Sequence, residues 1–123
     1  MHILIVDDVQ DTRELFSMAF VLAGHRTATA SSGAAALELV IKHRFDAILL
    51  DLKMQHVDGW KVLELIRQAP LGEKVPVILF SAHDNPDNEA RARQSGAYML
   101  LRKPMLPEYV LMIIEKAVSE YLA

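Results

Sequence analysis

The sequence contains no cysteine, which excludes a disulfide framework, a thiolate zinc site and a cysteine nucleophile. Long apolar runs are also absent: stretches such as 3–6 and 47–50 are too short to span a bilayer, and no charged leader with an apolar signal core follows Met1 and His2. Positive charge is not in excess, because 13 Lys and Arg face 16 Asp and Glu for a net charge of −3. We therefore expect a cytoplasmic protein that binds neither a membrane nor nucleic acid directly.

The composition that remains suits one compact domain. A chain of 123 residues with 52% hydrophobic residues can bury a core without disulfides or a structural metal. It shows no internal repeat, linker or low-complexity tract. We predict a single domain over residues 1–123.

Four short apolar runs predict β-strands at residues 2–6, 47–50, 75–80 and 98–101, and residues 26–30, which come after the helix-ending Gly24, are a fifth candidate. Between them, apolar residues recur at helical spacing and predict positions that face the core. These positions are Leu15, Ala19 and Leu22, then Ala36, Leu37, Val40 and Ile41, then Val62, Leu63 and Ile66, and finally Val110, Leu111, Ile114, Ala117, Val118 and Tyr121. The alternation predicts an α/β fold, in which helices cover both faces of a doubly wound parallel sheet to form a three-layer sandwich.

One predicted helix, over residues 87–94, differs from the others. Its only apolar residues are Ala90 and Ala92, so we expect it to pack weakly. A solvated surface helix explains this composition, and a mobile switch element is the alternative, since weakly packed segments rearrange most easily.

Polar residues stand where the predicted strands end. Asp7 and Asp8 follow the first strand, Asp51 the third, Ser81 the fourth and Lys103 the fifth. Ligands of open parallel sheets bind at these strand ends. Any one of the acids alone is explained as a helix cap, but three carboxylates together would repel and so imply a hard divalent cation, for which Mg²⁺ is suited. The five histidines are scattered and do not indicate a zinc or copper site.

A carboxylate beside such a cation can accept a phosphoryl group. The attack requires neutralisation of charge on the transferring group, which the metal and the Lys103 ammonium would share. The Ser81 hydroxyl could donate a hydrogen bond to another phosphoryl oxygen. For Lys103 the alternative is a surface lysine at a strand end.

Short motifs are spread along nearly the whole chain, and they are Ile3-Leu4-Ile5-Val6-Asp7-Asp8, Leu49-Leu50-Asp51-Leu52-Lys53-Met54, Asp58-Gly59, Ser81-Ala82, Gly96-Ala97 and Lys103-Pro104. Together they resemble the receiver domains of bacterial response regulators, including the chemotaxis receivers. The resemblance implies a flavodoxin-like sheet with strand order 2-1-3-4-5. It also implies that Asp7, Asp8, Asp51 and the main-chain carbonyl of Lys53 bind Mg²⁺.

The same resemblance implies a switch rather than a dedicated enzyme. Asp51 would take a phosphoryl group from a sensor histidine kinase or a histidine phosphotransfer protein, and the domain would catalyse its own phosphorylation and dephosphorylation. Ser81 would be the switch hydroxyl and Lys103 the phosphate-contacting lysine, with a cis bond to Pro104. The output would pass to a downstream protein or to an effector domain outside this chain.

Several positions depart from the family pattern. Gln55 stands where a proline is frequent, and Leu100 where tyrosine or phenylalanine is common. Tyr98, two residues before Leu100, is expected on the same strand face. Lys53 and His83 occupy positions that influence the lifetime of the phosphoryl group in similar proteins.

Three alternatives share parts of this pattern. A flavodoxin-like FMN module would need a Ser, Thr or Gly-rich phosphate loop where this chain has Val6-Asp7-Asp8-Val9-Gln10-Asp11. A phosphatase of the haloacid dehalogenase type would carry a second Asp where this chain has Lys53. A pseudo-receiver, which keeps the fold as a phosphorylation-independent interaction module, would normally have lost part of the site, whereas here the full set of acids, hydroxyl and lysine is present.

Overall fold

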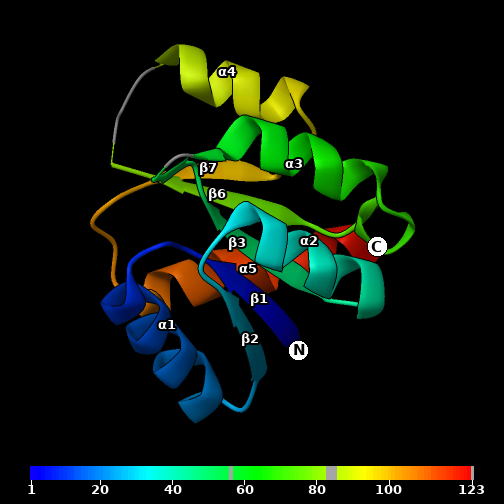
Figure 1. The fold of residues 1–123 in the computed structure, drawn as a ribbon. Helices are drawn as coiled ribbons and strands as arrows, with labels where there is room; N and C mark the ends of the chain where they lie inside the picture. Colours follow the sequence, from blue (N-terminus) through cyan, green and yellow to red (C-terminus); the bar gives the residue numbers. More distant parts are fainter. Residues whose placement is uncertain (56, 83–85, 123) are drawn as a thin grey trace.

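The computed structural model describes residues 1–55, 57–82 and 86–122, and its centre is a parallel sheet (Figure 1). The sheet has five strands in the order β2-β1-β3-β6-β7. The strands are β1 (His2–Val6), β2 (Arg26–Ala30), β3 (Ala47–Asp51), β6 (Val77–Ser81) and β7 (Met99–Arg102). Counting only these strands along the chain, the order is 2-1-3-4-5, so the predicted fold and strand order are confirmed.

Helices cover both faces of the sheet. They are α1 (Gln10–Leu22), α2 (Gly33–Lys42), α3 (Gly59–Gln68), α4 (Pro86–Gln94) and α5 (Pro107–Leu122). Figure 1 shows α2 and α3 in front of the sheet and α4 above α3, while α5 lies behind the sheet and packs beside α1. In the described part of the chain, no helix is long and apolar enough to cross a membrane.

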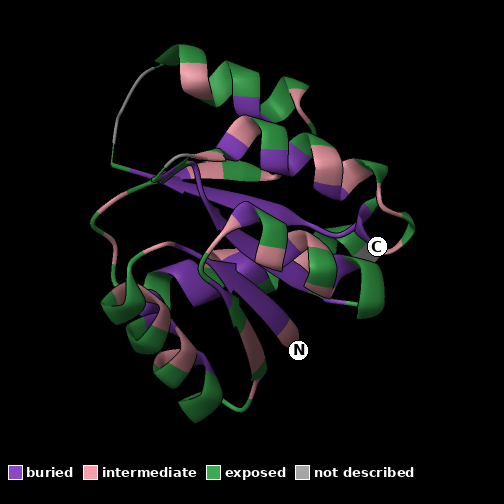
Figure 2. Cartoon of the chain, in the orientation of Figure 1, coloured by how far each residue is buried: buried purple, intermediate pink, exposed green. Residues whose placement is uncertain are grey.

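The strands form the interior of the molecule, as the purple ribbons of Figure 2 show. Every residue of β3 and β6 is buried. Side chains on one face of the sheet pack against α2, α3 and α4, and those on the other face pack against α1 and α5. This double coverage is why the parallel strands read as continuous apolar runs.

Three strands differ slightly from their predicted bounds, and the first of them, β3, ends at Asp51, one residue later than expected. The strand expected at 75–80 begins at Val77 instead, because Pro76 has no N–H to donate to the sheet. The last strand runs from Met99 to Arg102, one residue later than expected. Tyr98 therefore precedes the strand and packs with the α5 side of the core, whereas Leu100 packs on the opposite face. The expectation that these two side chains share a face is wrong.

The predicted core-facing stripe of α1 is wrong for its two leucines, whereas its third member, Ala19, is partly buried against the core. Leu15 and Leu22 are 56% and 81% exposed, and the helix buries Phe16 and Phe20. The Phe16 ring meets the Phe80 ring edge to face, with 5.6 Å between their centroids. Burying two large aromatic side chains outweighs the leucine spacing on which the prediction rested.

The other helices agree better with their predicted faces. Ile41 and Tyr121, expected in the core, are exposed. The remaining predicted positions of these helices are buried or partly buried, and they are Ala36, Leu37, Val40, Val62, Leu63, Ile66, Val110, Leu111, Ile114, Ala117 and Val118. Helix α4 buries Ala92 alone, which confirms its weak packing.

A small hairpin between β3 and α3 was not predicted. Its two strands, β4 (Lys53–Met54) and β5 (Val57–Asp58), pair antiparallel. Each strand has only two residues, so no alternating pattern could reveal it. A short 3₁₀ turn, η1 (Pro70–Gly72), follows α3.

Candidate functional site

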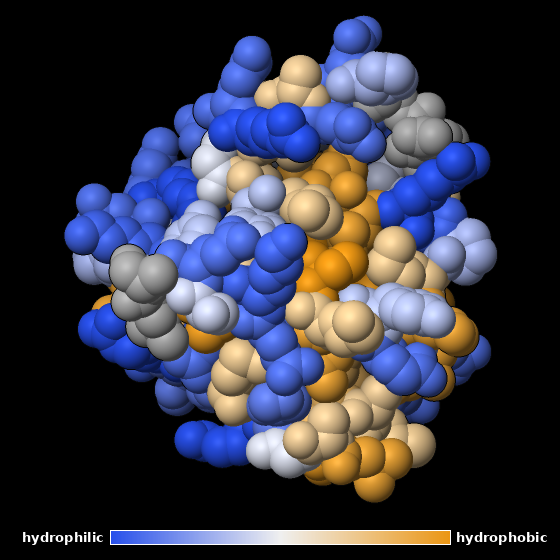
Figure 3. Space-filling model, turned by 180° about the vertical axis from the view of Figure 1, so that it is seen from behind, coloured by the Kyte–Doolittle hydropathy of each residue, from blue (hydrophilic) through white to orange (hydrophobic). Residues whose placement is uncertain are grey.

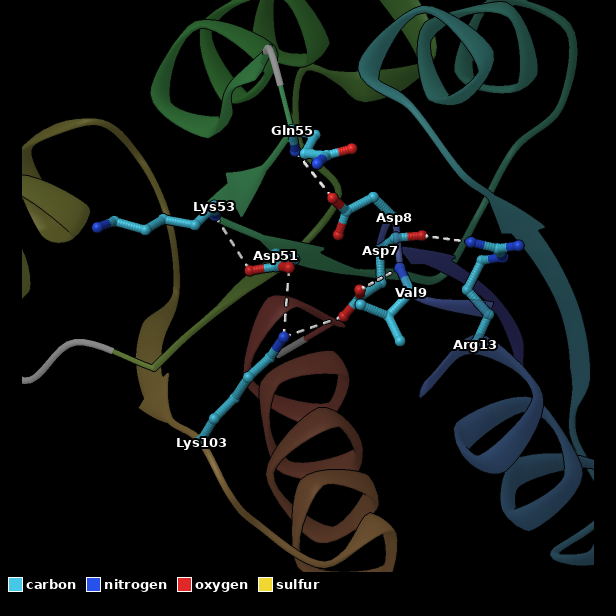
Figure 4. A network of polar contacts seen from close by, with 8 residues as sticks. All are labelled: Asp7, Asp8, Val9, Arg13, Asp51, Lys53, Gln55 and Lys103. Atoms are coloured by element: carbon cyan, nitrogen blue, oxygen red, sulfur yellow. Dashed lines mark hydrogen bonds and ion pairs between the residues drawn. The ribbon is translucent and has the colours of Figure 1, made fainter. Parts of the chain in front are cut away.

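The predicted site residues meet at one edge of the sheet (Figure 4). Asp7 and Asp8 directly follow β1, Asp51 ends β3, Ser81 ends β6 and Lys103 directly follows β7. Because these four strands are parallel neighbours, their carboxyl ends converge. Residues separated by as many as 96 positions thereby come into contact.

The three acids form a compact cluster. Asp7 and Asp51 are 2% and 5% exposed, and Asp8 is half-buried. Each offers one carboxylate oxygen, and these oxygens all lie within 4.8 Å of one another. Hard cations such as Mg²⁺ prefer carboxylate oxygens, with water or phosphate oxygens completing the coordination. The donor set therefore fits a magnesium ion.

The ammonium group of Lys103 lies between the two buried acids. Its Nζ is 3.1 Å from Asp7 Oδ2 and 3.2 Å from Asp51 Oδ2. Burial lowers the pKa of Lys103, but the two carboxylates outweigh burial and raise it overall. Lys103 is thus a protonated cation held where negative charge is concentrated.

The environment of Asp51 disfavours its charged form. Burial raises the pKa of Asp51, and the charge of Asp7 adds to the rise. The main-chain N–H of Lys53 donates to Asp51 Oδ1 at 3.1 Å, and this bond and the Lys103 ammonium lower the pKa without cancelling the effect of burial. A cation bound beside Asp51 would relieve this cost, because it favours the carboxylate.

Two contacts that orient Asp7 were missed from the sequence. The main-chain N–H of Val9 donates to Asp7 Oδ1 at 2.9 Å, and the Arg13 guanidinium donates to the main-chain carbonyl of Asp7 at 2.8 Å. An aspartate that accepts from the N–H two residues later is a common turn, so the first contact had a local signal. The second had none, because any residue presents the same carbonyl.

The β4–β5 hairpin brings main-chain donors to the acids. Besides the Lys53 N–H on Asp51, the Gln55 N–H donates to Asp8 Oδ2 at 2.8 Å. The base of the hairpin is closed by Gly59, whose N–H donates to the Leu52 carbonyl at 3.2 Å. A Cβ at Gly59 would lie 2.6 Å from the Leu52 main chain, so this close approach requires glycine. Whether the Lys53 carbonyl binds a metal stays a prediction.

The opposite wall of the site comes from β6 and β7. Ser81 is 2% exposed, and its carbonyl accepts the Lys103 N–H at 2.8 Å. Ser81 and Asp8 line the same groove. The Lys103–Pro104 bond is cis, as predicted. His83, expected to influence phosphoryl lifetime, lies outside the described residues.

A comparison with protein-family models places the chain. Residues 3–115 match the model of the response regulator receiver domain. The chain belongs to the response regulator receiver family. The receiver fold, its strand order and the polar strand ends agree with this membership.

Individual relatives agree with this family membership. The receiver is 34% identical to the regulatory protein AtoC of Escherichia coli over 118 residues, which are 96% of this chain and 25% of AtoC. Among solved structures, the chemotaxis protein CheY4 of Vibrio cholerae has a TM-score of 0.89 at 28% identity, with 94% of this chain and 97% of that chain covered. The receiver domain of a Pseudomonas aeruginosa sensor histidine kinase, solved with a magnesium ion in its active-site cleft, shares the fold with a TM-score of 0.85 at 24% identity, covering 96% and 97% of the two chains.

The receiver spans only part of its curated relatives. It covers 25% of AtoC and 45% of the transcriptional regulator HprR of Escherichia coli, to which it is 35% identical over 85% of its own length. The remaining parts of AtoC and HprR have no counterpart in the matched residues.

Proposed function

We propose that residues 1–123 form one receiver domain that works as a phosphorylation switch, with Asp51 as the phosphoacceptor and Mg²⁺ as the cofactor. The cation would be held by Asp7, Asp8, Asp51 and the main-chain carbonyl of Lys53. The observation that carries the proposal is the cluster of three acids with one lysine between two of them. A magnesium ion occupies the cleft of the kinase receiver named above, which shares this fold.

In the proposed reaction, an Asp51 carboxylate oxygen attacks the phosphorus atom of a phosphohistidine or an acyl phosphate. The new O–P bond forms as the bond from phosphorus to the donor breaks, and the donor atom keeps the electron pair. Mg²⁺ supplies neutralising charge for the phosphoryl oxygens when bound. The Lys103 Nζ lies 3.2 Å from Asp51 Oδ2 and would form an ion pair with a phosphoryl oxygen once the group is attached to Asp51.

The Ser81 hydroxyl would report the new group to the rest of the domain. Ser81 is buried at the end of β6 and joined through its carbonyl to Lys103. A hydrogen bond from the hydroxyl to the phosphoryl group would therefore pull on the end of β6. The domain itself would catalyse hydrolysis of the aspartyl phosphate by water, which restores the unphosphorylated state. Lys53 and His83 would influence the rate of this hydrolysis.

The partner that donates the phosphoryl group would be a sensor histidine kinase or a histidine phosphotransfer protein. The site is flanked by α1 and α5, which begin close after Asp8 and Lys103. Both helices expose large apolar side chains, among them Met18 and Met112 at 63% and 62%. Figure 3 shows apolar side chains gathered on the rear face of the molecule, where α5 lies. Exposed apolar side chains on two helices that begin near the acids suit a docking partner.

The output would reach a downstream protein or an effector domain outside this chain. AtoC and HprR are regulators much longer than the matched region, which supports this division of labour. We place the switch in the cytoplasm, where such regulators work, and assign it no direct contact with nucleic acid or membrane.

The function is tested with acetyl phosphate, Mg²⁺ and intact-mass measurement. The wild-type chain should gain one phosphoryl group, and both Asp51→Asn and removal of Mg²⁺ with EDTA should prevent the gain. Asp11→Asn, which removes an exposed acid of the first turn of α1, is the matched control and should behave as the wild type. A wild-type chain that stays unmodified even with a phosphorylated partner kinase would instead favour the pseudo-receiver.

A further inference from the structure

Asp8 differs from the other two acids of the cluster. Asp7 and Asp51 are buried and share the Lys103 ammonium, whereas Asp8 is half-buried. In the structure, the Asp8 carboxylate accepts the main-chain N–H of Gln55 at 2.8 Å. Figure 4 shows this bond on the side of the cluster away from Lys103.

The hydrogen-bond donor at position 55 is a main-chain N–H, which only proline lacks. The Gln55 side chain is exposed, and the contact is made by the main chain. Every amino acid except proline would offer the same N–H. A proline at position 55 would therefore remove a hydrogen-bond donor from the site.

The hairpin holds this donor in place. Its first strand is tied to the site by the Lys53 N–H on Asp51, at 3.1 Å. Its far end is fixed because Asp58 caps α3 by accepting the Trp60 N–H at 3.0 Å. Gln55 follows the strand that is tied to Asp51, so its N–H restrains the half-buried Asp8 side chain.

We propose that the main-chain N–H of Gln55 is a positioning donor that keeps the Asp8 carboxylate within the three-acid cluster before a divalent cation binds. Without it, repulsion from Asp7 and Asp51 would turn the half-exposed Asp8 toward solvent. Holding the ligand in place beforehand removes part of the cost of binding. This inference deepens the proposed function and rests on its assignment of the metal site.

The test compares two substitutions at position 55. Gln55→Pro removes the N–H, and Gln55→Ala keeps it and is the control. Mg²⁺ is titrated by the fluorescence of Trp60, the only tryptophan, which lines the same groove as Asp8 and Gln55, and by calorimetry. Loss of a hydrogen-bond partner of a metal ligand typically weakens binding by 10–100-fold, so we expect roughly a tenfold loss for Gln55→Pro and none for Gln55→Ala.

A third variant separates the N–H from the stiffness of proline. Replacing residue 55 by its α-hydroxy acid exchanges the N–H for an ester oxygen and leaves the rotation about the chain free. It should reproduce the loss seen with Gln55→Pro. In thermal unfolding without cation, Gln55→Pro should lower the midpoint more in the wild-type background than in Asp8→Ala, because the second background has no carboxylate to lose.

The outcomes distinguish this inference from the proposed function. If the wild type and both substitutions bind Mg²⁺ equally, or if loss of the N–H tightens binding, the positioning role is refuted while the metal site stands. Equal effects of Gln55→Pro in the two backgrounds would also refute it. If the wild type itself does not bind Mg²⁺, both the inference and the proposed function fail.

Discussion

Replacing Asp51 by asparagine should stabilise the cation-free domain at neutral pH. The substitution keeps the shape of the side chain and removes one buried charge. Lys103 would remain paired with Asp7, since it contacts both acids. Losing the attraction between Asp51 and Lys103 is offset by losing the repulsion between Asp51 and Asp7, so the relief of desolvation decides the sign.

The size of the effect follows from the burial of Asp51, which is only 5% exposed. Desolvating an ion costs several kcal/mol, and the contacts of Asp51 with the Lys53 N–H and with Lys103 offset most of this cost. Removing the charge should therefore raise the free energy of unfolding by about 1–2 kcal/mol. For a domain of this length, that is a rise of roughly 3–8 °C in the unfolding midpoint. Because the pKa of Asp51 is raised in the folded state, the cost grows as the pH rises above 3.8, the ordinary value, and persists at pH 7.

The assay is calorimetric unfolding of wild type, Asp51→Asn and the control Asp11→Asn in EDTA and in Mg²⁺. The gap between wild type and Asp51→Asn should narrow as the pH falls toward 3.8. It should shrink or reverse in Mg²⁺, since a ligand at 100 times its Kd adds about 2.7 kcal/mol to the form that binds it. An Asp51→Asn variant less stable than wild type in EDTA at pH 7, or a gap indifferent to Mg²⁺, would refute the reasoning.

Three further predictions concern Lys103, α4 and Tyr98. Lys103→Ala should bind Mg²⁺ several-fold more tightly in the Trp fluorescence titration, because a competing cation is removed, yet should fail to pass the signal to a partner. With beryllofluoride, amide hydrogen exchange should change across α4 more than around Leu100, which has no ring to reorient; the reverse pattern would contradict a switch in α4. Absorbance titration of the wild type, compared with Tyr98→Phe, should show a pKa of about 12 for Tyr98, because its hydrogen bond to Glu120 raises the pKa. This bond should stabilise the fold fully below pH 10, and the stabilisation should be lost as the pH rises through about 12.

Much of the fold and the site was predictable because the information is local. A parallel strand covered on both faces must be apolar along its length, so β1 and β3 stand out in the sequence, and the acids at their ends mark the edge where ligands bind. The helical period predicted four of the five helices, whereas α4, which buries Ala92 alone, has no such period. The period could not choose between Leu15 and Phe16 as the core face of α1, because both stripes repeat at helical spacing and the sheet opposite decides which one is buried.

The sequence by itself determined the class of the domain, the alternation of its elements and the residue types that gather at one end of the sheet. Only the tertiary structure decided which charges touch. That Lys103 lies between Asp7 and Asp51, and that the Gln55 N–H reaches Asp8 across 47 residues, depends on the register of neighbouring strands and on a four-residue hairpin pairing. Hydrogen bonds from the main chain carry no residue signature, so their partners become known only when the chain is folded.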